Sequence, residues 1–358
     1  MRIRAFTYFS FFVFFSFAAI LSAFGQNNND NTNNGNKTSK DSLYIIRLDT
    51  LLHLQSWISK SQMEYTVVYN ENFKLVLAPN VTNNLSLGFS YRYLDLGISF
   101  SPHFLNAGQE NGNKGETEQF SFRTSFSMHR FNLGFDLSSV KGFYLKNSAE
   151  SLRAAFPDSA YSVYPNFTVG YFSALLRYNV NRKFSTAALG GGTQIQRRSA
   201  ITVLPSFQFA TFKFGNSGNT AGIQNKSTYS TDLNLLFPVV GTIVISPEFS
   251  ATLGVGPSFG VDFFKSVALD DSNKIVISKG TKPTAGYSLQ TAVSYHKGRF
   301  FGGIESKYRS YGHKIENVSR LIKQYSYFQI FIGWRLRAPS FAKKSLDWVN
   351  KISPVDLD

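Results

Sequence analysis

The sequence predicts an all-β protein, specifically a transmembrane antiparallel β-barrel, and three observations support that prediction. Apolar and polar residues alternate with a period of two from about residue 64 to residue 338, which is the pattern of β-strands with two unlike faces. No stretch of 18 or more apolar residues follows residue 25, so a membrane-spanning helix is excluded beyond that point. Aromatic residues gather toward the ends of the alternating segments, as in an interfacial girdle.

The alternation has one apolar face and one polar face in each segment. The last segment is the clearest example. Its apolar face consists of Phe328, Ile330, Ile332, Trp334 and Leu336. Its opposite face consists of Gln329, Gly333, Arg335 and Arg337. A half-buried sheet in a soluble protein alternates too. The segments here are often ten or more residues long and recur without a helical pattern, which favours a barrel that crosses a membrane. The rings assigned to the girdle are Tyr91, Tyr93, Tyr178, Tyr295, Tyr308 and Trp334.

The two ends of the chain differ from this body. Residues 1–25 read as a cleaved signal peptide, with Arg2 and Arg4 before an apolar stretch and small residues at its exit; an uncleaved helical anchor is the alternative. Residues 26–63 are interpreted as a polar leader followed by a short periplasmic helix, because leucines recur there at roughly helical spacing. The barrel is assigned to residues 64–339, and residues 340–358 to a short periplasmic C-terminal tail.

Twelve strands are expected, the first of them at residues 73–79. An even number returns the C-terminus to the periplasm, where short turns lie in bacterial barrels. The segment 184–212 is too long for one strand, and an extra hairpin at residues 194–200 would raise the count to fourteen. Short turns are expected near 129–131, 180–183, 246–248 and 296–299, and long loops near 104–117, 146–164, 213–227, 265–283 and 312–323.

The charge balance is basic, with 37 Lys and Arg against 22 Asp and Glu, a net charge of +15. For an exported chain this favours anionic lipid or small anionic solutes over nucleic acid. The alternation directs many charges to the polar interior, and the candidate ligand-binding set is Arg92, Arg123, Arg177, Glu305, Lys307, Arg309, Arg335 and Arg337. These charges could form internal ion pairs that hold the barrel shape. They could also line a narrow anion-binding pore, since the guanidinium fork suits carboxylates and phosphates.

Catalytic and metal chemistry find little support in the sequence. The five histidines fall at expected turns, loops or the leader, none of them beside a serine in a recognisable motif. No two histidines are three or four residues apart, and the chain has no cysteine, so neither a metal site, a cofactor nor a disulfide is expected. The glycine-rich residues 188–193 lack the lysine of a phosphate-binding loop and are interpreted as a bend in a barrel strand.

Several short motifs resemble a known family. They are the segment 85–100, RFNLGFDLSSVKGFYL at 130–145, Tyr44-Ile45 near the start, and a basic, Gln-rich stretch at 194–198. The sequence is similar to the outer-membrane family of Bacteroidota labelled domain of unknown function 4421. It departs from the family pattern at residues 238–241, where Pro-Val-Val-Gly stands in place of a Gly-Tyr pair. The resemblance implies a β-barrel in the outer membrane and supplies no catalytic or ligand residues.

The sequence therefore predicts an integral outer-membrane barrel that acts as a narrow channel or anion-binding pore. The alternatives are a structural or partner-docking barrel of an envelope machine, an outer-membrane enzyme that acts on lipids, and a soluble secreted β-sandwich. The expected partners are outer-membrane lipid and either small anionic solutes or a periplasmic protein.

Overall fold

The computed structural model describes residues 43–68, 74–80, 83–106, 114–146, 161–216, 227–269, 275–315 and 319–352. The predicted signal peptide and most of the polar leader lie outside these residues. The elements are β1 (Ile45–Arg47), β2 (Leu51–Val68), β3 (Lys74–Ala78), β4 (Asn83–Tyr91), β5 (Leu94–Phe100), α2 (His103–Asn106), β6 (Glu118–Met128), β7 (Phe131–Leu145), β8 (Val163–Tyr178), β9 (Gln194–Gln196), β10 (Ala200–Val203), β11 (Ser206–Asn216), β12 (Ser227–Leu236), β13 (Val239–Val244), β14 (Phe249–Leu269), β15 (Ile275–Lys297), β16 (Phe300–Ile315), β17 (Ser319–Arg337) and α4 (Ser340–Ile352).

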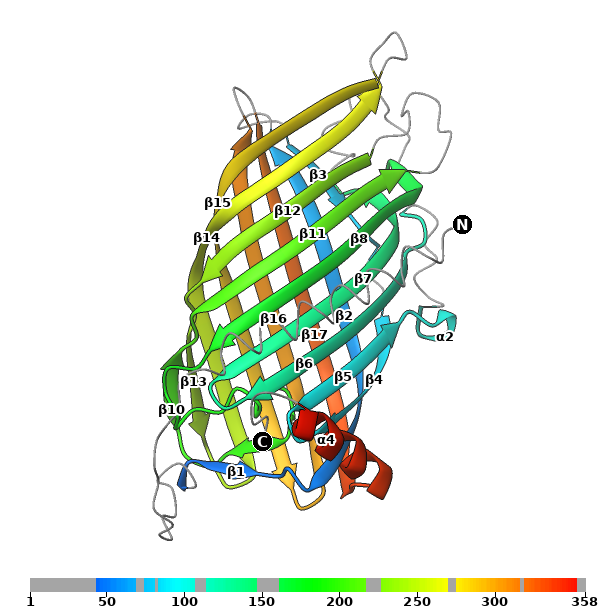
Figure 1. The fold of residues 1–358 in the computed structure, drawn as a ribbon. Coiled ribbons are helices and arrows are strands. Elements are labelled where there is room, and N and C mark those ends of the chain that lie inside the picture. Colours follow the sequence, from blue (N-terminus) through cyan, green and yellow to red (C-terminus); the bar gives the residue numbers. More distant parts are fainter. Residues whose placement is uncertain are drawn as a thin grey trace.

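Twelve hydrogen-bonded strands close into a ring, which confirms the predicted antiparallel barrel and its strand count (Figure 1). The ring runs β14-β12-β11-β8-β7-β6-β5-β4-β2-β17-β16-β15, and the pairing of β14 with β15 closes it. Every neighbouring pair is antiparallel. Closure leaves no free edge around the ring, so the backbone groups of its strands pair within the wall as a bilayer requires.

Two wall strands are interrupted by proline. Both β12 and β13 pair with the same edge of β14, and Pro238 lies between them. Pro205 separates β10 from β11 in the same way. Proline has no N–H, so neither residue can donate to a ladder at its position.

The outer surface of the barrel carries a band of exposed apolar side chains. On β17 the outward residues Phe328, Ile330, Ile332 and Trp334 are 43–59% exposed, while the alternate residues Gln329, Phe331 and Arg335 are buried. Other strands around the ring contribute outward Leu54, Leu87, Ile98, Phe122, Leu253, Phe259 and Val293. An apolar exterior around a polar interior is the surface of an outer-membrane-type barrel.

The first barrel strand differs from the prediction. Residues 51–68 form β2, an 18-residue wall strand between β4 and β17, so the short helix predicted within residues 26–63 is wrong. Leu54 and Ile58 are exposed on the outer face, while His53 and Trp57 are buried on the inner face. This is a period of two, but the leucines of the segment also fit a helical spacing, which led to the wrong prediction. Trp57 packs where the facing pair Gly88 and Gly97 leaves room, since a Cβ at either position would approach its ring within 2.9 Å.

The segment predicted as the first strand is β3, which lies outside the twelve-strand ring. It pairs with Tyr65–Val68 of β2 on one edge and with Tyr144 and Leu145 of β7 on the other. The predicted total of twelve is therefore correct although its first strand is not: β2 was missed, and β3 was counted in its place.

The two ends of the barrel are unlike. At one end, called here the short-turn end, tight turns join β4 to β5, β6 to β7 and β15 to β16. The prediction that residues 180–183 form a short turn between two barrel strands is wrong. These residues belong to a 27-residue connection between β8 and β11, residues 179–205, which contains β9 and β10. At the opposite, long-loop end, β14 and β15 run through much of the loop predicted at 265–283.

Two further elements lie at the short-turn end. The strand β1 pairs with β9 in a separate two-stranded sheet, and α4 follows β17 at the foot of the barrel (Figure 1). Within the described ranges, no helix has both the length and the apolar character needed to cross a membrane.

Candidate functional site in the barrel lumen

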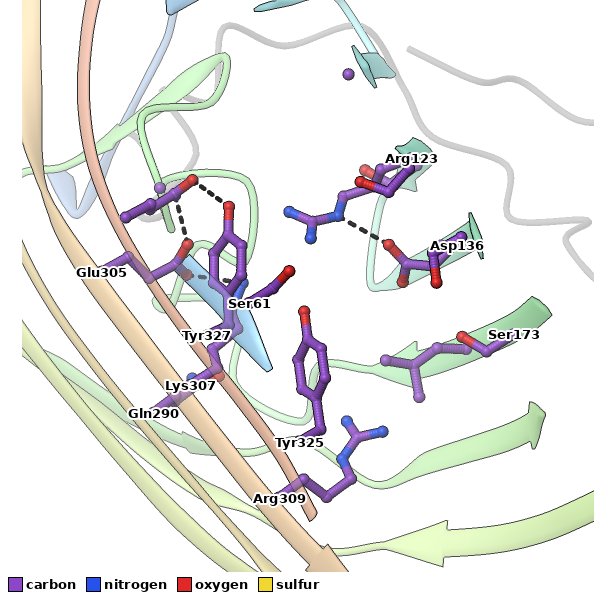
Figure 2. Close-up of a pocket in the computed structure, with 18 of the residues that line it drawn as sticks. Ser61, Arg123, Asp136, Ser173, Gln290, Glu305, Lys307, Arg309, Tyr325 and Tyr327 are labelled. Carbon is purple, nitrogen blue, oxygen red and sulfur yellow. Dashed lines mark hydrogen bonds and ion pairs between the residues drawn. The ribbon is translucent and has the colours of Figure 1, made fainter. Parts of the chain in front are cut away.

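The lumen holds a cavity of about 350 Å³, and Figure 2 shows some of the residues that line it. Its wall includes five cationic side chains, Arg123, Arg177, Lys307, Arg309 and Lys323, and three carboxylates, Asp95, Asp136 and Glu305. Serines are the most frequent of the remaining lining residues, and glutamines and tyrosines also occur among them. The polar face predicted from the alternation is thus the lining of a real chamber.

Three of the cations are held by carboxylates. Arg123 Nε donates to Asp136 Oδ1 at 2.8 Å, and Lys307 Nζ lies 2.8 Å from Glu305 Oε1. Lys323 Nζ lies 2.9 Å from Asp232 Oδ2 and 3.1 Å from Asp262 Oδ2, with all three side chains almost fully buried. Asp95 accepts a hydrogen bond of 3.0 Å from Ser125. Part of the lumen charge therefore forms the internal ion-pair network that the sequence allowed.

Arg177 and Arg309 are bonded differently. Arg309 Nη1 donates to the amide oxygen of Gln208 at 2.6 Å, and Arg177 Nη1 makes a long contact of 3.4 Å with the amide oxygen of Asn132. Neither forms an ion pair with a carboxylate in the part of the chain that the structure describes. Amide oxygens carry no full charge, so neither guanidinium group has its positive charge balanced by a directly bonded carboxylate.

Two tyrosines of β17 stand among these charges. Tyr325 and Tyr327 are both inward, with ring centroids 6.4 Å apart and planes within 9° of parallel. The guanidinium of Arg123 lies 5.2 Å from the Tyr327 ring centroid. In Figure 2, Tyr325 extends between Arg123 and Arg309. Flat aromatic and guanidinium surfaces therefore meet at the same height of the lumen.

Side chains narrow the lumen toward the long-loop end. A buried cluster contains Tyr65, Val140, Phe143, Val169, Ala210, Phe212 and Tyr311, from strands β2, β7, β8, β11 and β16. Tyr65 and Phe212 belong to β2 and β11, which are six places apart around the ring and so face each other, yet their ring centroids are 6.4 Å apart. Lys323 lies against this cluster, 4.7 Å from the Phe212 ring. Rings and a buried charge thus narrow the bore at this level.

A loop closes the lumen toward the short-turn end. Residues 186–192 of the long connection contribute Thr186, Ala187, Leu189, Gly190 and Gly192 to the cavity wall, and we call this segment the plug. Gly190 lies beside Glu305 and Gln329, since a Cβ there would be 3.5 Å from the Glu305 carboxylate.

Gly191 is the closest point of contact between the plug and the wall. A Cβ at this position would lie 2.8 Å from the ring of Phe301 and 2.9 Å from that of Phe331. Gly190 and Gly191 have φ of +72° and +86°, a region that favours glycine. The glycine run is therefore not a bend in a strand, as predicted, but the tip of the plug.

The plug is tied to the N-terminal part of the chain. On its C-terminal side, β9 pairs with β1 through Ile45–Arg47, and Leu48 N donates to Thr193 O at 2.9 Å. Thr193 Oγ1 also donates to the carbonyl of Arg92 in the β4–β5 turn at 3.0 Å. On its N-terminal side, Phe184 is buried with Leu204 and Val240. The plug is thus held at both of its ends.

The structure brings together five of the eight predicted lumen residues: Arg123, Arg177, Glu305, Lys307 and Arg309. It places three elsewhere. Arg92 is in the β4–β5 turn with φ of +54°, and its guanidinium pairs with Asp347 of α4 at 2.6 Å. Arg335 is buried at the short-turn rim, 2.7 Å from His296 Nδ1 and over the ring of Phe301, while Arg337 is an exposed strand end.

Sequence reasoning missed the tyrosines and the plug. Tyr325 and Tyr327 share the inner face with Lys323 and Gln329, so alternation within β17 was enough to find them. The excess length of segment 184–212 was the only signal of the plug, because its partner β1 is about 150 residues away in sequence. Tyr91 and Tyr93 are buried, and the Tyr93 hydroxyl contacts the Leu346 carbonyl of α4, so they do not belong to the girdle.

No group of three or more His, Cys, Asp or Glu that could hold a metal occurs within the described ranges. The acidic pair Asp270-Asp271 lies outside them.

Burial raises the pKa of Asp49, between β1 and β2, although the positive charges of Arg47 and Arg92 act to lower it.

Comparisons with solved structures return outer-membrane barrels at low similarity. The outer membrane protease OmpT from Escherichia coli is 8% identical with a TM-score of 0.34, over 81% of this chain and 98% of that one. An outer membrane channel from Pseudomonas putida F1 is 11% identical with a TM-score of 0.33, over 84% of this chain and 100% of that one. The Pseudomonas putida toluene transporter TodX is 7% identical with a TM-score of 0.26, over 80% of this chain and 90% of that one. None of these similarities bears on activity.

No curated protein matches the chain. The sequence does match a family model described as a domain of unknown function, DUF4421, over residues 39–336. This match covers the barrel up to the next-to-last residue of β17 and confirms the resemblance seen in the sequence: the chain belongs to the DUF4421 family.

Proposed function

We propose that this outer-membrane barrel is a narrow pore that binds and passes small anions. The observation that carries the proposal is the pair of lumen arginines, Arg177 and Arg309, which face the cavity with amide partners and no carboxylate. Removing a cation from water costs free energy unless a negative charge lies nearby. An anion that enters the cavity can supply that negative charge, and its binding is then favourable.

The size and shape of the chamber support a small solute. A volume of about 350 Å³ is at the low end of ligand-binding cavities. The guanidinium fork binds carboxylates and phosphates through two parallel hydrogen bonds. The proposed ligands are therefore small carboxylates, phosphate and inorganic anions.

Ion selectivity in planar bilayers tests this role. Under a KCl gradient the reversal potential of the wild-type pore should show a preference for chloride. The double variant Arg177→Gln, Arg309→Gln should lose most of that preference because the two cationic side chains without an ion-pair partner are gone. Arg130→Gln is the matched control, since Arg130 bonds Tyr178 at the short-turn rim and does not line the cavity. Equal reversal potentials in all three proteins would contradict the proposal.

A second candidate role is docking to a periplasmic partner through the sheet of β1 and β9. Tyr44 lies there with Lys183 Nζ at 5.0 Å and the Arg198 guanidinium at 5.8 Å from its ring centroid, a basic surface suited to an acidic protein. Charge reversal at Lys183 and Arg198 should abolish co-purification of any such partner and leave bilayer conductance unchanged. Unaltered co-purification would exclude this surface.

We infer no enzymatic role. Within the described residues, the side-chain hydrogen bond of His296 goes to Arg335, and no hydrogen bond joins a serine hydroxyl to a histidine ring. Release of fatty acid from phospholipid vesicles by the purified protein, in excess of a heat-inactivated sample, would contradict this inference.

A further inference from the structure

The helix α4 runs along the rim of the barrel. It begins three residues after β17 ends, and half-way along it Asp347 pairs with Arg92 and the Leu346 carbonyl accepts from Tyr93. Arg92 and Tyr93 form the β4–β5 turn, and β2 separates β17 from β4 in the ring. A helix that joins these two points lies across the rim at the foot of the barrel (Figure 1).

One side of α4 presents apolar side chains with no cover. Phe341, Trp348 and Ile352 are 71%, 63% and 59% exposed, and their spacing of seven and four residues places them in one stripe. Leu346 and Val349, on the side toward the barrel, are only partly exposed. The stripe is therefore additional to the surface that attaches the helix to the rim.

Charge and position identify what covers this stripe. Lys344 and Lys351, also seven residues apart, flank the stripe, while the one acidic residue of the helix, Asp347, is already paired with Arg92. The outward residues that precede the helix, Trp334 and Leu336, belong to the apolar band of the barrel. The stripe thus continues the lipid-facing surface of the barrel, and the two lysines lie along one side of it.

We propose that α4 is an interfacial helix that lies in the phospholipid headgroup region of the membrane leaflet at the short-turn end. Phe341, Trp348 and Ile352 enter the boundary between headgroups and acyl chains, and the lysines contact phosphates, as in amphipathic helices that lie on membranes. This goes beyond the proposed pore and is independent of it. In a bacterial barrel the short-turn end faces the periplasm, so the ligand is the phospholipid of the inner leaflet of the outer membrane.

Quenching of tryptophan fluorescence by brominated phospholipid tests the position of the stripe. The chain has three tryptophans, of which Trp57 is buried and Trp334 faces lipid. The variant Trp334→Phe therefore leaves Trp348 as the one tryptophan that lipid could reach. The full-length variant, refolded into phosphatidylcholine and phosphatidylglycerol vesicles, is compared with Trp334→Phe, Trp348→Phe to isolate the Trp348 signal.

The proposal expects Trp348 emission to move to shorter wavelength in vesicles and to be quenched more by bromine near the headgroup than by bromine deep in the acyl chain. Adding Phe341→Ser and Ile352→Ser should abolish this quenching, while the heat-dependent gel mobility of the barrel stays unchanged. Replacing Lys344 and Lys351 with Gln should weaken it more in anionic than in zwitterionic vesicles. Trp348 emission that is unaffected by brominated lipid in a folded barrel overturns the proposal, and the stripe would then be left for a protein partner.

Discussion

The two ends of the lumen are closed by different kinds of structure. Toward the long-loop end the closing groups are side chains of the wall itself, with Tyr65 against Phe212 across the bore and Lys323 between Asp232 and Asp262. Toward the short-turn end the closing group is the plug, a glycine-rich loop that the wall surrounds. One closure is part of the barrel and the other is an insertion into it.

This difference indicates which end can open. Wall side chains are fixed by the register of a closed ring, so separating Tyr65 from Phe212 requires either a rotamer change in a packed cluster or deformation of the ring. Displacing the plug breaks only contacts of one connection, and local openings of this kind cost less than global unfolding. A pore built this way should be gated at the short-turn end, with the ring cluster at the other end as a fixed constriction that small ions still pass.

The largest expected effect comes from Gly191→Val. The added side chain meets the rings of Phe301 and Phe331, and φ of +86° is strained for a β-branched residue, so the plug should be expelled and single-channel conductance should rise severalfold. Gly215→Val is the matched control, because a Cβ there has no neighbour within 4 Å. A folded Gly191→Val protein with wild-type conductance would show that the plug is not the barrier.

The next largest effect concerns stability at the long-loop end. Lys323→Met leaves the buried carboxylates of Asp232 and Asp262 facing each other without their cation, and we expect a loss of about 3–5 kcal/mol in the free energy of unfolding. Urea unfolding of the refolded barrel, followed by gel mobility, measures it. The triple variant Lys323→Met, Asp232→Asn, Asp262→Asn should recover most of the loss, and failure to do so would mean that Lys323 acts through packing.

The smallest effect is the coupling of the two facing rings. A double-mutant cycle of Tyr65→Leu and Phe212→Leu should give an interaction energy of about 0.5–1.5 kcal/mol, as edge-to-face aromatic pairs do. Conductance should change less than in Gly191→Val, since leucine still fills much of the same space. A larger rise in conductance than that of the plug variant would reverse the assignment of the gate.

Local pattern was sufficient to predict most of the wall. The alternation in β16 and β17 placed Glu305, Lys307 and Arg309 inward and Ile330 and Trp334 outward, as the structure has them. The period of two is a property of each strand alone, so it needs no knowledge of the neighbours.

What pattern could not predict depends on contacts that are distant in sequence. The plug is held by β1, which pairs with Gln194–Gln196. The start of β2 was predicted to be helical because its apolar residues recur at roughly helical spacing. Arg92 alternates correctly for the lumen but lies in a turn with positive φ, where alternation no longer applies. Five of the lumen charges were therefore found, and the closures at the two ends were not.

The bridge that β3 makes between β2 and β7 has a consequence for the shape of the bore. Below it the wall passes from β2 to β7 through three strands, β4, β5 and β6; above it β3 alone spans the same interval, so ten strands in place of twelve encircle the lumen there. Barrel diameter grows roughly linearly with strand number, and barrels of about eight strands are just wide enough for side chains to fill. The bore is thus narrower toward the long-loop end, where aromatic side chains are large enough to obstruct it. Toward the short-turn end it is wider, and a loop rather than single side chains occupies it.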